Sequence, residues 1–201
     1  KQLGLKGAMI HGLSCGKMID EREFWPIFEV AEELDVPIYL HPADPDKTVT
    51  ERYYSPYDKS HPMVTRAAWG FGIETGTQAV RLILSGIFDR HPKLKIFLGH
   101  FGEAIPFWLP RIHESFTRPG NEHIDFKRIF KENFWITTSG FFSDNALELC
   151  LKVLNAEKIL FAVDWPYANN KVGVDWLANA PIDKHTKNLI FSENARNLFN
   201  L

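Results

Sequence analysis

The 201-residue sequence lacks the features that would tie it to a membrane, a nucleic acid or an oxidising compartment. No apolar run approaches the roughly 20 residues that a bilayer-spanning helix needs, and the N-terminus does not resemble a signal peptide. Lys and Arg, 23 in all against 25 Asp and Glu, are scattered, so we expect no nucleic-acid or membrane partner. Only two cysteines occur, Cys15 and Cys150, at unrelated spacing, which predicts a cytoplasmic protein without disulfides.

Two phosphate-binding motifs are also missing. Neither GxGxxG nor GxxxxGK[ST] follows any apolar segment that could be a strand. This absence argues against a nucleotide-binding, doubly wound sheet.

What the sequence does contain is a regular alternation of short apolar strands and amphipathic helices. We predict strands at 6–10, 36–40, 95–99, 134–138 and 159–163, each followed by helical sequence. After the last strand the predicted helical sequence covers 181–201, with Ser192 as the cap of a final amphipathic turn. A polar loop over 42–62 interrupts the second unit, and a segment of that length without structure of its own is typical of a lid or substrate wall. Long crossovers between strands indicate a parallel α/β sheet, either doubly wound or a TIM barrel.

Polar residues at the ends of several strands favour the TIM (β/α)8 barrel. Five units of about 40 residues fill the chain, so we expect a single domain over 1–201 that covers roughly strands four to eight. The first three units would then be absent, which agrees with the abrupt start at Lys1 in the middle of a strand–helix unit.

Three of the predicted strands end on a residue that can bind a metal or transfer a proton. His41 follows the strand at 36–40, His100 follows the strand at 95–99, and Asp164 follows the strand at 159–163. Imidazole and carboxylate together suit Zn, Mn or Fe. A catalytic metal needs three or more protein ligands and an open position, so these three residues would be an incomplete shell if His100 had another task.

Several motifs together resemble one enzyme family. They are YLHP at 39–42, LGHFGEAIPFWLPR at 98–111, TSG at 138–140, FAVDWPY at 161–167 and NARNLF at 194–199. In order and spacing they are similar to the amidohydrolase superfamily. The similarity is greatest to its decarboxylating branch, which includes relatives of aminocarboxymuconate semialdehyde decarboxylase and the resorcylate and dihydroxybenzoate decarboxylases.

The resemblance implies roles for individual residues. His41 and Asp164 would bind one divalent metal, zinc first and manganese second, with His100 as a third ligand or as the acid/base. Glu103 would orient His100, and Asp164 would also take part in catalysis. Arg111 would hold the substrate carboxylate in a neighbouring subunit, which implies a homodimer or higher homo-oligomer. The first-strand HxH or ExH ligand pair of the family has no counterpart in this sequence.

The expected activity is therefore the metal-dependent decarboxylation of a small hydroxylated aromatic or dienoic carboxylic acid. Trp69, Phe141 and Tyr167 could line the substrate, although aromatic residues after strands more often belong to the core. His11 ends the first strand and could face the site or simply pack. Two alternatives stay open: a metal-dependent hydrolase of a lactone or cyclic ester, and a catalytically incomplete barrel module.

Overall fold

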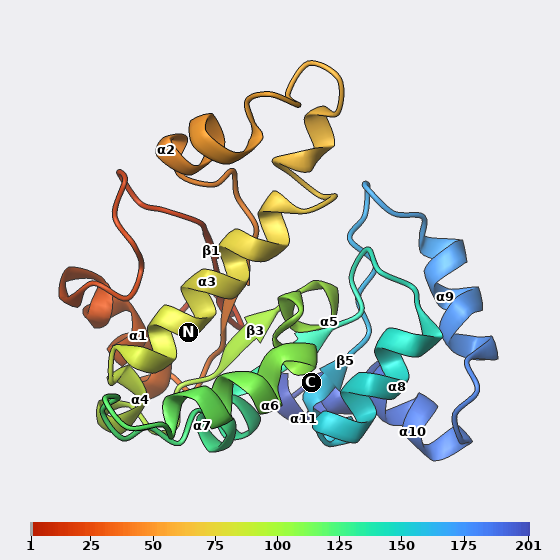
Figure 1. The fold of residues 1–201 in the computed structure, drawn as a ribbon. Helices are drawn as coiled ribbons and strands as arrows, with labels where there is room; N and C mark the ends of the chain where they lie inside the picture. Colours follow the sequence, from red (N-terminus) through yellow and green to blue (C-terminus); the bar gives the residue numbers. More distant parts are fainter. Residues whose placement is uncertain (1) are drawn as a thin grey trace.

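The structure is a computed structural model that describes residues 2–201. Five parallel strands form one sheet in the order of the sequence (Figure 1). The strands are β1 (Ala8–His11), β2 (Ile38–His41), β3 (Ile96–Leu98), β4 (Phe134–Thr137) and β5 (Ile159–Leu160). Sequential parallel pairing through crossover helices is the arrangement of a βα barrel, as the sequence predicted.

Helices follow every strand, and those up to α8 lie between one strand and the next. The main ones are α1 (Trp25–Glu33), α3 (Gly70–Leu84), α4 (Ile87–Arg90), α6 (Ile105–Phe116), α7 (Phe126–Asn133), α8 (Asp144–Val153), α9 (Asn170–Asn179), α10 (Lys184–Asn188) and α11 (Asn194–Phe199). The helices α3, α6, α7 and α8 lie along one side of the sheet (Figure 1). Of these helices, α9 was not predicted from the sequence, and the Asn169 side chain caps it.

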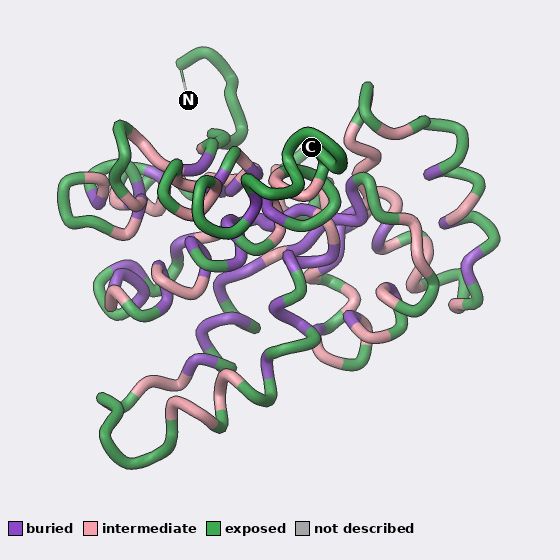
Figure 2. Tube along the Cα trace, turned by 45° about the horizontal axis from the view of Figure 1, so that its top comes forward, coloured by how far each residue is buried: buried purple, intermediate pink, exposed green. Residues whose placement is uncertain are grey.

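Strand alternation separates a helix-facing surface from a surface that faces the barrel interior. The helix-facing residues, such as Leu40, Ile96 and Ile136, are at most 2% exposed and pack against the helices. The opposite surface carries aromatic residues, and Phe97 makes edge contacts with Tyr39 and Trp135 at ring-centroid distances of 6.2 and 6.3 Å. Figure 2 shows the buried positions running through the middle of the molecule.

Three local predictions differ from the structure. The segment predicted as an irregular loop at 42–62 contains the short helices α2 (Lys47–Val49) and η2 (Thr50–Tyr54), and η3 (Pro62–Val64) begins at its end. Asp46 starts α2 by accepting the Thr48 N–H at 2.8 Å. The strand predicted at 159–163 ends at Leu160, and Ser192, expected to cap the last helix, lies inside η5 (Leu189–Glu193). Across residues 2–201, the longest helices are too short or too polar to cross a bilayer.

Candidate active site

His41 is the last residue of β2, and one hydrogen bond determines which of its nitrogens is free. Its Nδ1 lies 2.7 Å from the carbonyl oxygen of Pro42. A carbonyl can only accept, so Nδ1 donates and Nε2 keeps its lone pair in the neutral ring. This leaves Nε2 available as a metal ligand or proton acceptor. The parallel register places His11 of β1 beside it, with the two ring centroids 4.4 Å apart.

His100 lies in an unusual turn immediately after β3. Five consecutive residues have positive φ angles: 48° at His100, 56° at Phe101, 80° at Gly102, 51° at Glu103 and 62° at Ala104. Only one of the five is glycine, and a left-handed conformation costs roughly 1–2 kcal/mol for each other residue. Backbone strain of this kind is concentrated at functional sites. Buried contacts of Phe101 and Glu103 hold the turn in place.

The turn brings Glu103 back onto His100. His100 Nδ1 donates to Glu103 Oε1 at 2.7 Å, and the Glu103 residue is only 8% exposed. Two glycines of α3 make room for it: a Cβ at Gly72 would lie 3.1 Å from Glu103 Oε2, and one at Gly76 would lie 3.1 Å from the Glu103 carbonyl oxygen. The helix thus packs directly against the carboxylate.

The electrostatics of this pair follow from its burial. Burial alone would lower the pKa of His100, but the hydrogen bond and charge of Glu103, together with the charge of Asp164, outweigh it and raise the pKa. Burial also raises the pKa of Glu103, against the opposing effect of its bond to His100. The pair therefore holds a proton on the imidazole more firmly than an isolated histidine would.

Asp164 approaches His100 from the other side. It follows β5 with a φ of 71°, and its Oδ2 lies 4.0 Å from His100 Nε2. Thr138 fixes the segment before it, because the Thr138 hydroxyl donates to the Ala162 carbonyl at 2.8 Å and accepts the Ala162 N–H at 3.2 Å. Gly140 leaves the necessary space: its Cβ would lie 3.0 Å from Asp164 Oδ2.

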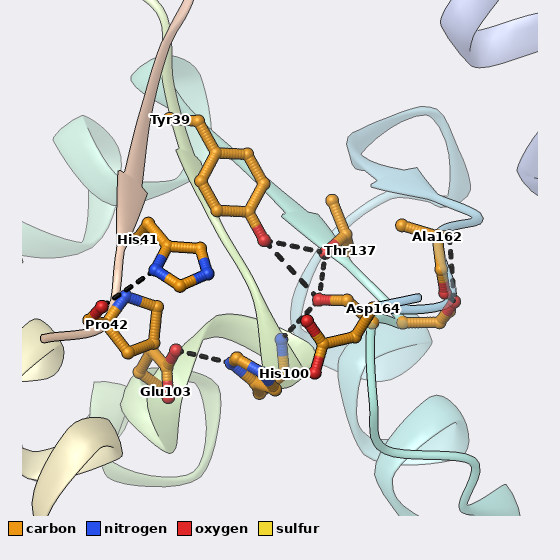
Figure 3. Close-up of polar contacts among 10 residues, drawn as sticks. Tyr39, His41, Pro42, His100, Glu103, Thr137, Ala162 and Asp164 are labelled. Atoms are coloured by element: carbon orange, nitrogen blue, oxygen red, sulfur yellow. Dashed lines mark hydrogen bonds and ion pairs between the residues drawn. The ribbon is translucent and has the colours of Figure 1, made fainter. Parts of the chain in front are cut away.

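The structure thus brings together His41, His100, Glu103 and Asp164 at one end of the sheet (Figure 3). The donor types, imidazole nitrogen and carboxylate oxygen, fit a divalent metal. Among residues 2–201, however, no group of three His, Cys, Asp or Glu side chains is close enough to hold one. Metal binding by His41, His100 and Asp164 stays a prediction.

The four predicted substrate-binding residues are all exposed. Phe141 follows β4, is 48% exposed and makes an edge contact with Phe101 at 5.8 Å. Tyr167 and Trp69 are 87% and 57% exposed. Arg111 lies on α6 with its guanidinium carbon 5.7 Å from the centre of the Trp108 ring. Substrate roles for these residues stay predictions.

Sequence reasoning missed a group of hydroxyls beneath His100. Tyr39, Thr137 and Ser139 come together there, and the Ser139 hydroxyl accepts the backbone N–H of His100 at 3.3 Å. The only available signal was the polar end of a strand at 137–139, within and beside the TSG motif already noted.

Comparison with known proteins identifies the family. The sequence model of the amidohydrolase family matches residues 1–201, the full chain. The chain belongs to the amidohydrolase family.

Among curated amidohydrolases, the chain is 37% identical to a gamma-resorcylate decarboxylase from Polaromonas sp., over 100% of this chain and 64% of that protein. A solved dihydroxybenzoic acid decarboxylase from Polaromonas sp., with bound manganese and the inhibitor 2-nitroresorcinol, superposes with a TM-score of 0.89 at 34% identity, over 100% of this chain and 62% of that one. A 5-carboxyvanillate decarboxylase from Novosphingobium aromaticivorans, also with manganese, gives a TM-score of 0.89 at 32% identity, over 100% of this chain and 58% of that one. The chain therefore has an α/β fold whose five-stranded parallel sheet matches part of the TIM barrel of these amidohydrolases, and it spans somewhat under two thirds of their length.

Proposed function

We propose that the chain forms the last five βα units, strands four to eight, of a barrel enzyme that decarboxylates a small hydroxylated aromatic carboxylic acid without an oxidant. The observation that carries the proposal is the His100–Glu103 pair, 2.7 Å long, facing Asp164 at the carboxyl ends of parallel strands. Sequential strand order and similarity to decarboxylases over the whole chain support it.

The residues of the site suit this reaction. Decarboxylation replaces a carboxylate on a ring carbon by a proton, so an acid must deliver that proton. His100 is the donor through Nε2, because Glu103 already accepts from Nδ1 and stabilises the imidazolium. The hydrogen bond and charge of Glu103 raise the pKa of His100, which favours the protonated form of the donor.

A bound divalent metal would add Lewis-acid polarisation of the substrate oxygens. His41 Nε2 and the Asp164 carboxylate would hold it, together with further donors. Manganese in the two solved decarboxylases favours manganese here over zinc, which stays an untested prediction. Elemental analysis of the purified chain, loaded with each metal in turn, measures which one is retained.

Carbon dioxide release from 2,6-dihydroxybenzoate and 5-carboxyvanillate, with manganese present, tests the activity. We expect His100→Gln to abolish turnover. His91→Gln is the matched control, because His91 is also a buried histidine bound to a glutamate, Glu32, at 2.9 Å, but lies away from the site. Equal losses in both variants, or no carbon dioxide from either acid, would contradict the proposal.

The two alternatives give other outcomes in the same assay. Ring opening of a lactone without carbon dioxide release would identify a hydrolase, in which the metal activates water. Turnover of neither substrate class would indicate a catalytically incomplete module.

We also propose that the enzyme is a homodimer or higher homo-oligomer that uses the exposed face of α6. Phe107 and Trp108 are 65% and 45% exposed, and their rings meet edge to face at 5.4 Å. Arg111 extends the same face. Tryptophan, phenylalanine and arginine are residue types enriched in protein interfaces.

A further inference from the structure

Gly99 connects β3 to the turn that carries His100, and its lack of a side chain matters for steric reasons alone. Its φ of −72° is accessible to any residue. A Cβ there, however, would lie 2.7 Å from the Tyr39 hydroxyl oxygen and 3.0 Å from the Ser139 hydroxyl oxygen. Hydroxyl groups from β2 and from the segment after β4 therefore fill the space beside Gly99.

These hydroxyls form a small cluster, the hydroxyl cluster, made of Tyr39, Thr137 and Ser139. The oxygen of Ser139 lies 2.8 Å from that of Thr137 and 3.4 Å from that of Tyr39, and the Tyr39 and Thr137 oxygens are 3.5 Å apart (Figure 3). Thr137 and Ser139 are 3% and 5% exposed. Each hydroxyl has one proton and two lone pairs, so the three can satisfy one another in a ring.

The ring leaves one lone pair of Ser139, and the His100 N–H uses it at 3.3 Å. The first residue of the strained left-handed turn is thus anchored to β2 and β4 as well as to its own strand.

We propose that the hydroxyl cluster positions His100, with Ser139 as the residue that anchors the His100 backbone and with Tyr39 and Thr137 holding Ser139 in place. Loss of the anchor lets the strained turn relax and moves the imidazole away from Glu103 and Asp164. The catalytic consequence rests on the proposed decarboxylase function, but the positioning itself can be measured without turnover.

Nuclear magnetic resonance of the full chain with ¹⁵N-labelled histidine tests the positioning. The His100 Nδ1–H signal, assigned by its loss in His100→Gln, reports the bond to Glu103. We expect Ser139→Ala to shift or broaden this signal. Ser143→Ala is the control, because it removes the N-cap of α8 but does not touch the site. An unchanged signal in Ser139→Ala would overturn the proposal.

A second pair of variants tests the same contact if Ser139→Ala does not fold. Gly99→Ala forces a Cβ against the Tyr39 hydroxyl, so it should perturb the His100 signal. Tyr39→Phe removes the oxygen, so the double variant Gly99→Ala/Tyr39→Phe should recover part of the signal. If the changes that the two substitutions cause in the His100 signal simply add in the double variant, the proposed contact is contradicted.

Kinetics separate this inference from the proposed function. If the chain is a decarboxylase, we expect Ser139→Ala to lower kcat by about 10-fold to 100-fold with little change in KM. A displaced His100 signal in a chain without decarboxylase activity would support the positioning and reject the function. Unchanged kcat and signal would reject the positioning and keep the function.

Discussion

In the strained turn after β3, the free-energy cost of a positive φ angle is compensated at some residues and not at others. His100 and Glu103 contact each other, and Phe101 is buried, so their positive φ angles are compensated by the site and the core. Ala104 also has a positive φ, of 62°, but its side chain is exposed. The cost at Ala104 thus has no compensating contact from the side chain.

Replacing Ala104 by glycine should therefore stabilise the protein. Glycine adopts this conformation without the steric penalty, so we expect a gain of about 1 kcal/mol in the free energy of unfolding, measured with urea. Ala178→Gly is the control: this exposed residue of α9 should lose up to about 1 kcal/mol on the same substitution. Destabilisation in both variants would show that the turn is not left-handed in solution.

Glu74 gives a prediction about pH. Its carboxyl group, in a residue 6% exposed, accepts from Gln78 at 3.2 Å, and burial raises its pKa above the ordinary 4.5 despite this hydrogen bond. A raised pKa means that the folded state binds the proton more tightly than the unfolded state does. The stability that protonated Glu74 contributes is therefore present at low pH and is lost as the pH rises through the folded-state pKa.

Glu74→Gln mimics the protonated group at every pH. The variant should match the wild type in acid and become the more stable of the two as pH rises through and above the folded pKa. Urea unfolding across that range measures the difference. A constant difference at all pH values would show that the carboxyl group titrates normally.

At the level of elements, the sequence predicted the strands well and the turn poorly. Apolar runs that end at His41 or Gly99 identify β2 and β3, because strands of a parallel sheet are covered on both faces and therefore read as near-continuous apolar runs. The left-handed turn could not be predicted, since HFGEA contains one glycine and its conformation depends on contacts with α3 and β4. The end of β5 at Leu160 likewise depends on tertiary contacts, because the Phe161 N–H bonds to Ile190 and Ala162 bonds to Thr138.

Asn133 connects the end of α7 to the segment that leads into β3. At the end of α7, its amide donates to the carbonyls of Pro92 and Leu94, both at 2.9 Å, on the segment leading into β3. Removing both bonds leaves buried acceptors unpaired, so Asn133→Ala should cost roughly 2–4 kcal/mol. Asn179→Ala, which removes one exposed bond to Asp175, should change the free energy of unfolding by less than about 0.5 kcal/mol. Similar costs for both variants would contradict the anchoring role.

At the scale of the whole molecule, the α6 face lies one turn away from the site. The left-handed turn ends at Ala104 and α6 begins at Ile105, so the helix that carries Phe107, Trp108 and Arg111 continues directly from the turn of His100. A partner bound on this face would therefore contact the helix that begins where the His100 turn ends.

The proposed oligomer predicts that a substitution on the α6 face weakens association between subunits. Trp108→Ala removes a large aromatic side chain from the centre of the α6 face, so we expect the dissociation constant between subunits to rise about 30-fold or more, as for interface positions worth at least 2 kcal/mol. Analytical ultracentrifugation over a concentration series measures it. Val174→Ser, on α9, is the control, since Val174 is 44% exposed and Trp108 is 45% exposed. A wild-type chain that stays monomeric at all concentrations would exclude the oligomer. Equal effects of the two substitutions would show that the interface does not lie on the α6 face.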